Sequence, residues 1–189
     1  ATRFLPRGVA VWWSAMSFKT LKIGTLEIPV RSAIDADQTY TEIGGETVLR
    51  TISGAGIRQE TWKRTRTTIN GSGWLPAGLA AIDTAVSVDV ACIAPQARVA
   101  DVNRQAALPA ARRSDAGHTP WALALLPDGG LANTTLGIAG NVATAGAVAG
   151  ATGYLINYFP LLHCWVNRPT QSFSVAAGSH TWEIIAEEV

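Results

Sequence analysis

The chain has 189 residues, of which 48% are hydrophobic and only 15% are charged, and its formal net charge is +1 at pH 7. One hydrophobic core commonly serves about 100 to 200 residues, so we expect a single domain spanning residues 1–189. A net charge so close to zero excludes a global basic field that would recruit nucleic acid or an anionic membrane. An average protein has about 25% charged residues, so a surface this poor in charge favours burial against other subunits.

The first segment, residues 1–19, contains a short apolar run that is interrupted by Ser14 and Ser17. This run is too short to span a bilayer, and no signal-peptide cleavage site follows it. We therefore expect a protein that is made in the cytoplasm, with Ala1 following a removed initiator methionine.

Strand-like runs separated by Gly, Pro, Asn and Asp recur along the chain, whereas helical periodicity is scarce. The expected fold is mainly β: a β-sandwich or split β-barrel with long loops and at most a short helix. Residues 21–30 and 47–53 are predicted strands. The clearest predicted strand covers residues 86–92, where alternate apolar side chains share one face. Cys92 and Cys164 have apolar neighbours and are expected to be buried free thiols.

Two segments before residue 57 are predicted to be turns. Residues 32–45, which include Asp35 and Asp37, are expected to form a polar turn that ends at Gly44 and Gly45. The second turn, at residues 54–56, has two glycines and is expected to need positive φ angles.

Residues 57–69 form a highly charged predicted strand. Its even-numbered positions, which alternation places on one face, hold the side chains Arg58, Glu60, Trp62, Arg64 and Arg66. Neither face is a continuous apolar stripe, so we expect this strand to pair with the strand at residues 86–92 in a hairpin. In the connection, residues 68–83, Trp74 and Leu75 are expected to act as an apolar plug, and Pro76 to begin one helical turn.

The second half of the chain contains two unusual segments. Residues 100–120 are polar and are predicted to form an exposed loop or flap. Residues 136–159 are rich in Gly and Ala and carry no charge, which on hydropathy alone is typical of a membrane span. Asn141 and Asn157 interrupt this segment, so we expect a loop and buried strands there and no stable membrane insertion. The chain closes with two predicted strands around a turn at Gly178.

The residues with catalytic or metal-binding chemistry are scattered. The three histidines lie far apart without a cysteine pair, so we expect no metal site. His163 and Cys164 are adjacent, and adjacent strand residues face opposite sides, which argues against a catalytic dyad. The glycine motifs lack the flanking residues of a phosphate loop or a nucleophile elbow. The sequence therefore predicts a protein that is not an enzyme and that needs no cofactor.

The cluster Arg58, Lys63, Arg64 and Arg66 around Trp62 could contact nucleic acid through phosphates and stacking. With a net charge near zero, acidic partners are available, and the cluster is better explained by pairing with a neighbouring subunit.

One long stretch, "GGETVLRTISGAGIRQETWKRTRTTINGSGWLPAGLAAID" at residues 44–83, is followed by "SVDVACIAPQA" and, at the end of the chain, by "SHTWEIIAEE". These segments resemble small tail-tip or baseplate proteins of bacteriophages with long non-contractile tails, similar to distal tail proteins. The resemblance covers about half the chain. Ala77 stands where the family pattern has a second proline, and Gln96 and Ala97 stand where it has an arginine.

The resemblance implies a structural subunit of the virion that is made in the host cytoplasm. In such a tail, subunits form a homo-oligomeric ring, commonly a hexamer, that connects the tail tube protein to the hub and baseplate proteins. DNA would pass transiently through its lumen. The subunit-interface candidates are Arg58, Glu60, Trp62, Arg64, Arg66, Trp74 and Leu75.

Three other readings remain open. A carbohydrate-binding module would expose Trp74, or Trp12 and Trp13, and would bind host glycan as a monomer. A hydrolase with an unrecognised site would gather acidic or histidine side chains in a pocket. A membrane-active tail component would use residues 136–159.

Overall fold

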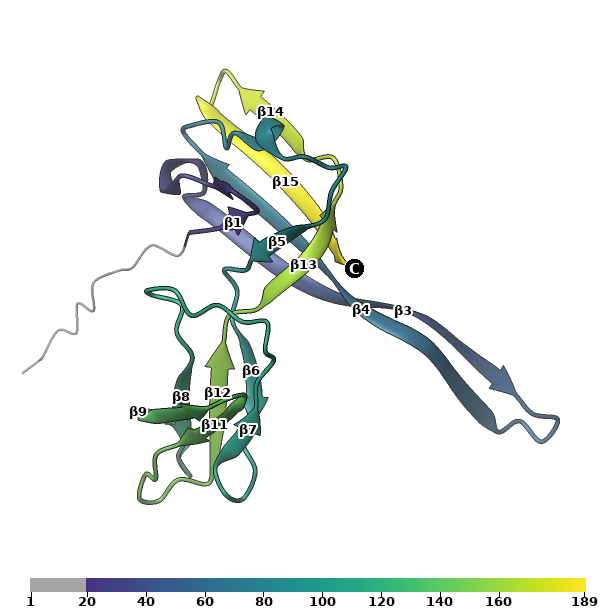
Figure 1. Ribbon diagram of the computed structural model, residues 1–189, viewed down its shortest axis with the longest axis vertical. Coiled ribbons are helices and arrows are strands. Elements are labelled where there is room, and N and C mark those ends of the chain that lie inside the picture. The colour runs from purple at the N-terminus through teal and green to yellow at the C-terminus, as the bar shows by residue number, and fades with distance from the viewer. Residues whose placement is uncertain (1–19) are drawn as a thin grey trace, which may run out of the picture.

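A computed structural model gives the structure of residues 20–189. The expectations for residues 1–19, including those for Trp12 and Trp13, concern residues outside this range. The described chain is mainly β, as predicted, and its strands form three antiparallel sheets (Figure 1).

The largest sheet has eight strands in the order β2-β1-β5-β13-β15-β4-β3, and β14 pairs with β15 beside this path. Its strands are β1 (Lys22–Ile23), β2 (Leu26–Glu27), β3 (Asp35–Arg50), β4 (Gly56–Gly73), β5 (Val88–Ala91), β13 (Leu161–Val166), β14 (Thr170–Ser174) and β15 (Ser179–Glu188). β14 and β15 form the predicted hairpin at Gly178, whose φ of 59° is the left-handed conformation that glycine adopts readily.

The two smaller sheets are built entirely from residues 96–159. A four-stranded sheet contains β6 (Gln96–Val99), β12 (Gly153–Tyr158), β8 (Trp121–Leu125) and β9 (Leu131–Thr134), in this order. A three-stranded sheet contains β10 (Leu136–Ala139), β11 (Val142–Ala145) and β7 (Gln105–Ala107). The uncharged segment therefore forms strands, as expected, but they are not all buried, since Ile138 and Val142 are 42% and 43% exposed. In the part of the chain that the structure describes, no helix is long and apolar enough to cross a membrane.

The core is divided into two clusters where the sequence predicts one domain. The first lies in the main lobe, which comprises residues 20–95 and 160–189, and includes Ile69, Val90 and Ile184. The second lies in the inserted lobe, residues 96–159, and includes Ala143 and Ile156. Figure 1 shows the two lobes joined where β5 leads to β6 and β12 leads to β13.

Several predictions about local structure are wrong. Residues 21–30 do not form one strand, because β1 and β2 pair there as a short hairpin. The polar segment around Asp35 is not a turn, because it forms the first half of β3. β5 does not form a hairpin with β4: it pairs with β1 and β13, while β4 pairs with β3 and β15. Finally, the single helical turn between these strands, η2 (Leu79–Ala81), begins after Gly78 and not at Pro76. The other helical turn, η1 (Val30–Ser32), precedes β3.

Sheet packing in the main lobe depends on one close approach. The indole of Trp182 is only 4% exposed and lies over Gly71 on the neighbouring strand β4, where a Cβ would overlap the ring. Its Nε1 donates a hydrogen bond of 2.7 Å to the backbone oxygen of Ser32, so a buried donor is satisfied. Glycine at position 71 therefore leaves the space that the Trp182 ring occupies.

The two cysteines are free and buried, as predicted. Burial raises the pKa of the Cys164 thiol to about 12 and also raises that of Cys92. Both thiols are therefore protonated and unreactive near neutral pH.

The predicted flap at residues 100–120 is exposed only in part, because it contains β7 and a buried lock between the lobes. The lock is Arg113, which is 3% exposed. Its Nη1 donates to three main-lobe carbonyl oxygens, those of Thr20 at 2.9 Å, Ala91 at 3.1 Å and Cys92 at 2.9 Å. Nε and Nη2 donate to the two carboxylate oxygens of Asp115 at 2.9 and 2.7 Å.

His118 completes this lock. Its ring is 2% exposed and meets the ring of Phe159 edge-on, with the centroids 5.0 Å apart. The hydrogen bonds from Arg113 lower the pKa of Asp115, and burial lowers the pKa of His118. Both shifts mean that the unfolded chain binds protons more readily. The stability contributed by His118 is thus lost as the pH falls below about 6.5, and that of Asp115 as it falls below about 3.9.

We predict that Arg113→Ala destabilises the protein by about 3 kcal/mol, because it leaves buried carbonyl groups and a carboxylate without their donor. Urea denaturation measures this change. Arg98 is exposed on β6, so the matched control Arg98→Ala should cost no more than about 0.5 kcal/mol. Equal effects of the two substitutions would show that Arg113 does not lock the lobes together.

Candidate assembly site

The most distinctive feature of the molecule is a two-stranded arm. β15 pairs with β4 only from Arg66 to Gly73, whereas the ladder between β3 and β4 continues out to Arg50 and Gly56. Residues 42–65 therefore project from the main lobe as a hairpin that is covered by no other strand of the described chain (Figure 1). We call these residues the arm.

Nearly all side chains of the arm are exposed on both faces. A two-stranded ribbon is marginally stable in water, and each of its edges presents unpaired backbone N–H and C=O groups. The described chain supplies no hydrophobic layer against the arm, so both of its faces are open to solvent.

A β-bulge between Gly45 and Glu46 lies within the arm, where the sequence suggests a turn. Gly45 faces Trp62 and Glu46 faces Glu60, so Thr61 is the extra residue on β4. A Cβ on Gly45 would overlap the side chains of both Thr61 and Trp62, and one on Gly44 would overlap the backbone oxygen of Trp62. The two glycines thus permit the close approach that the bulge requires.

The bulge corrects the prediction that the five charged and aromatic side chains share one face. Arg64 and Arg66 lie opposite Ile43 and Thr41, and Trp62 lies opposite Gly45, all odd-numbered positions of β3. By contrast, Arg58 and Glu60 lie opposite even-numbered positions of β3. Because directly opposed residues share a face, Arg58 and Glu60 lie on the other side of the arm from Trp62, Arg64 and Arg66.

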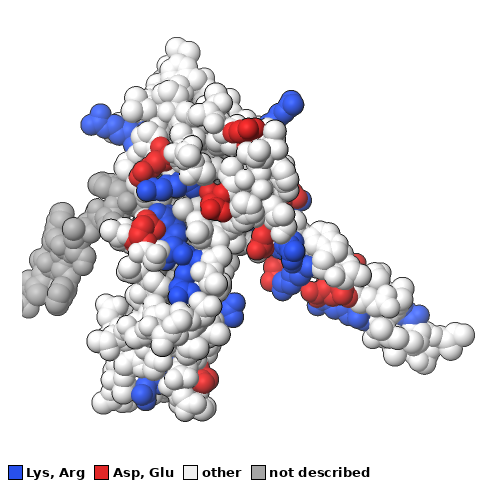
Figure 2. Space-filling model, viewed as in Figure 1, with Lys and Arg blue, Asp and Glu red and all other residues white. Residues whose placement is uncertain are grey.

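The charges of the arm already have partners within the chain. Arg58 forms ion pairs with Glu46 and Glu60, and Lys63 Nζ lies 2.7 Å from Glu42 Oε1. The hydrogen bond to Glu42 raises the pKa of Lys63. Figure 2 shows basic and acidic side chains intermingled along the arm. An exposed pair contributes about 0 to 1 kcal/mol, so these pairs fix local geometry more than stability.

The two arginines nearest the main lobe are also engaged. Arg66 Nη2 lies 2.8 Å from Glu187 Oε1 on β15, and Arg64 Nε donates to the backbone oxygen of Val189 at 2.7 Å. They anchor the base of the arm on β15 and on the residue after it.

The outer end of the arm is apolar. Exposed aliphatic side chains cluster in the arm tip, residues 47–57: Val48 (57%), Leu49 (50%), Ile52 (111%) and Ile57 (51%). Gly54, with a φ of 83°, makes the predicted left-handed turn there. Trp62, farther along the arm, is 51% exposed.

Trp74 and Leu75 do not plug the connection after β4, because they are 69% and 45% exposed. Ala77 and Leu79, at 2% and 1%, are the buried residues of this loop. The loop is held by its backbone: the amide of Trp74 donates to the oxygen of Arg31 at 2.8 Å.

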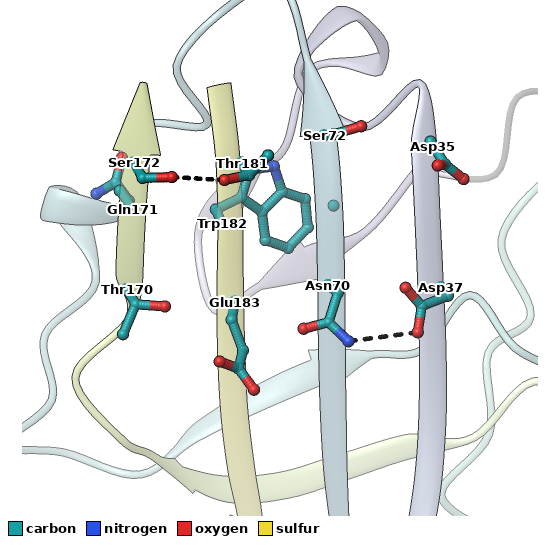
Figure 3. A pocket seen from close by; sticks show the side chains of 11 residues that line it. Asp35, Asp37, Asn70, Ser72, Thr170, Gln171, Ser172, Thr181, Trp182 and Glu183 are labelled. Carbon is teal, nitrogen blue, oxygen red and sulfur yellow. Dashed lines mark hydrogen bonds between the residues drawn. The ribbon is translucent and has the colours of Figure 1, made fainter. Parts of the chain in front are cut away.

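A second surface feature is a polar groove on the sheet face that points away from the core (Figure 3). It has a volume of about 430 Å³ and crosses four strands. Two rows of side chains line it: Ser172, Thr181, Ser72 and Asp35, and Thr170, Glu183, Asn70 and Asp37. Its lining includes three carboxylates and no Lys or Arg.

Within residues 20–189, no group of three His, Cys, Asp or Glu side chains is placed to hold a metal ion. His163 is exposed and its Nδ1 lies 2.8 Å from Asp89 Oδ1, whereas Cys164 points into the core. The adjacent pair thus faces opposite sides, as predicted.

Comparisons with protein-family models, with curated proteins and with solved structures find no significant match.

The sequence predicts the charged strand of the arm but not the free hairpin that it forms with β3. The sequence does indicate the arm in one respect. Residues 42–65 lack an apolar stripe on either face, which is typical of a β-ribbon that packs on no core. The groove was missed because its residues come from four separate strands.

We predict that arm amides exchange with deuterium far faster than amides of β4 within residues 67–73, because only the latter are flanked by strands on both sides. Hydrogen exchange followed by mass spectrometry on dilute protein measures the contrast. Equal protection of the two regions in a monomer would contradict a free arm.

Proposed function

We propose that this protein is a structural subunit of a bacteriophage tail. It forms a homo-oligomeric ring, commonly a hexamer, at the distal tip and connects the tail tube protein to the hub and baseplate proteins. The lumen of the ring lets DNA pass. In this role the chain is not an enzyme and needs no cofactor.

The observation that carries the proposal is the arm. A free two-stranded ribbon with apolar residues at its tip costs ordering entropy and returns little burial on its own chain. Extended ribbons acquire stability by adding to a sheet or surface of another chain. An arm that reaches beyond its own core is therefore well suited to linking one subunit to the next around a ring.

Several of the residues expected at the subunit contact are already held in ion pairs within the chain, so other residues act at the proposed contact. The candidates Arg58, Glu60, Arg64 and Arg66 chiefly hold the arm in shape and at its base. The arm tip, whose exposed aliphatic side chains surround a single charged residue, Arg50, is available to a neighbour together with the exposed Trp62. This arrangement also avoids a strongly basic lumen, which would hold DNA back as it passes.

We predict that removing residues 45–62 and joining Gly44 to Lys63 through Asn-Gly abolishes self-association and leaves a folded monomer. Gly44 and Lys63 are opposed in the ladder, so a two-residue turn can close the shortened hairpin. Light scattering across a range of concentrations measures the mass, and circular dichroism monitors the fold.

Lys63→Gln is the matched control, because it removes an exposed ion pair and keeps the arm; it should assemble like the parent chain. A parent chain that stays monomeric at every concentration, or a shortened chain that assembles equally well, would overturn the ring.

A second candidate function is binding of host surface glycan. Two observations favour it: the polar groove offers carboxylate, amide and hydroxyl groups that can bind sugar hydroxyls, and Trp74, two residues after Ser72, exposes a ring on which a sugar can stack.

If this candidate is correct, Trp74→Ala should weaken oligosaccharide binding at least tenfold, measured by calorimetry with soluble bacterial surface glycans. Trp165→Ala is the control, since that ring is 47% exposed and lies on β13 outside the groove. Absence of binding by the parent chain would remove the candidate.

A further inference from the structure

The main lobe has an apolar surface pocket that its own core does not fill. It has a volume of about 250 Å³ and is lined only by aliphatic side chains, among them Leu21, Ile28, Val30, Ile34 and Ile93. Ile34 is 51% exposed and Val30 36%, so the pocket opens to the surface. Its volume far exceeds the roughly 30 Å³ of a water molecule, and its lining offers water no polar side chain.

The arm tip presents the complementary feature. Ile52 is fully exposed, and Leu49 and Ile57 are half-exposed on opposed positions of the ribbon. The tip therefore holds a small group of aliphatic side chains without cover, on the same chain as an aliphatic pocket without an occupant from the described residues.

Strand geometry prevents the tip from reaching the pocket of its own chain. Ala36, which lines the pocket, and Arg50, at the tip, lie on the same continuous strand β3. Fourteen residues of strand at about 3.3 Å each separate them by roughly 45 Å. Leu21, which lines the pocket, directly precedes β1. Figure 1 shows the arm pointing away from β1.

Charge is complementary as well. Arg50 is the one charged residue between Glu46 and Arg58, and among residues 20–189 its guanidinium bonds only to the backbone oxygen of Gly54, at 3.2 Å. Asp35 directly follows Ile34 at the rim of the pocket. Neither Asp35 nor Asp37 forms an ion pair with any described residue, and Asp37 accepts only from Asn70.

We propose that the arm tip of one copy inserts Ile52 and its aliphatic neighbours into this pocket of a second copy, with Arg50 facing Asp35. The contact joins two different surfaces of the same chain, so it repeats from copy to copy and closes a ring when the rotation permits. This inference rests on the proposed function and adds the specific contact to it.

A charge swap tests the contact. Arg50→Glu and Asp35→Arg should each weaken self-association at least tenfold, measured by light scattering across a range of concentrations. The double variant in one chain should recover association, because Glu at position 50 of one copy then meets Arg at position 35 of the next. Loss in both single variants without recovery would overturn the pairing.

Apolar variants test the insertion. Ile52→Ser and Ile34→Ser should each weaken association, whereas Val102→Ser, at a site 97% exposed on the inserted lobe, should not. All three sites are exposed, so the variants should fold. A mixture of Ile52→Cys and Ile34→Cys chains should also form a disulfide-linked dimer on mild oxidation, because Cys92 and Cys164 are buried.

The outcomes separate the two proposals. Association that survives every tip and pocket variant but is lost with the shortened arm would place the arm on another surface, and the ring would stand without this contact. A different result would be that the pocket variants associate normally, but lose association when residues 1–19 are also removed. That result would assign the pocket to residues 1–19 and overturn the proposed contact. A parent chain that never associates would overturn both proposals.

Discussion

The arm exists because two neighbouring ladders of the main sheet have different lengths. β15 accompanies β4 only as far as Arg66, whereas β3 accompanies it out to Gly56. From Arg66 to Gly73, β4 is flanked by strands on both sides and packs on a core. The rest of β4 has one partner strand and solvent on both faces. The same strand is thus a central strand at one end and an edge at the other, and its side chains change from buried to exposed at that point.

The sequence predicted those features of the fold that depend on local alternation and on composition. The mainly β fold, the hairpin at Gly178 and the burial of both cysteines follow from local patterns. The pairing of the strands did not follow, because β4 finds its partners at residues 35–50 and 179–188 and the sequence alone suggested the next strand along the chain. The bulge could not be predicted for a related reason. One extra residue, Thr61, moves the side chains beyond it to the opposite face of the ribbon, and alternation counted along a single strand cannot show this.

The few charged side chains have different roles at the junction of the two lobes and on the arm. At the junction, one buried guanidinium satisfies three carbonyl groups of the main lobe and a carboxylate beside it, so the few charges present are used to fix one lobe on the other. On the arm, exposed charges pair across the ribbon and hold its shape, while the tip is left apolar. The junction is therefore held by buried hydrogen bonds, whereas the arm is held by its own ladder and by exposed ion pairs.

The position of β15 also has a consequence for the timing of folding. This strand, residues 179–188, lies between β4 on one side and β13 and β14 on the other, so it fills a central place in a sheet whose other strands are made earlier. While the ribosome is still adding these residues, β4 has an open edge along its whole length, and Trp182 is absent from its place over Gly71. Long-range pairing of this kind is slow, and unpaired edges promote aggregation while they persist. Newly made chains should accordingly keep this edge exposed until β15 is in place, so the main sheet is complete only once residues 179–188 have been added.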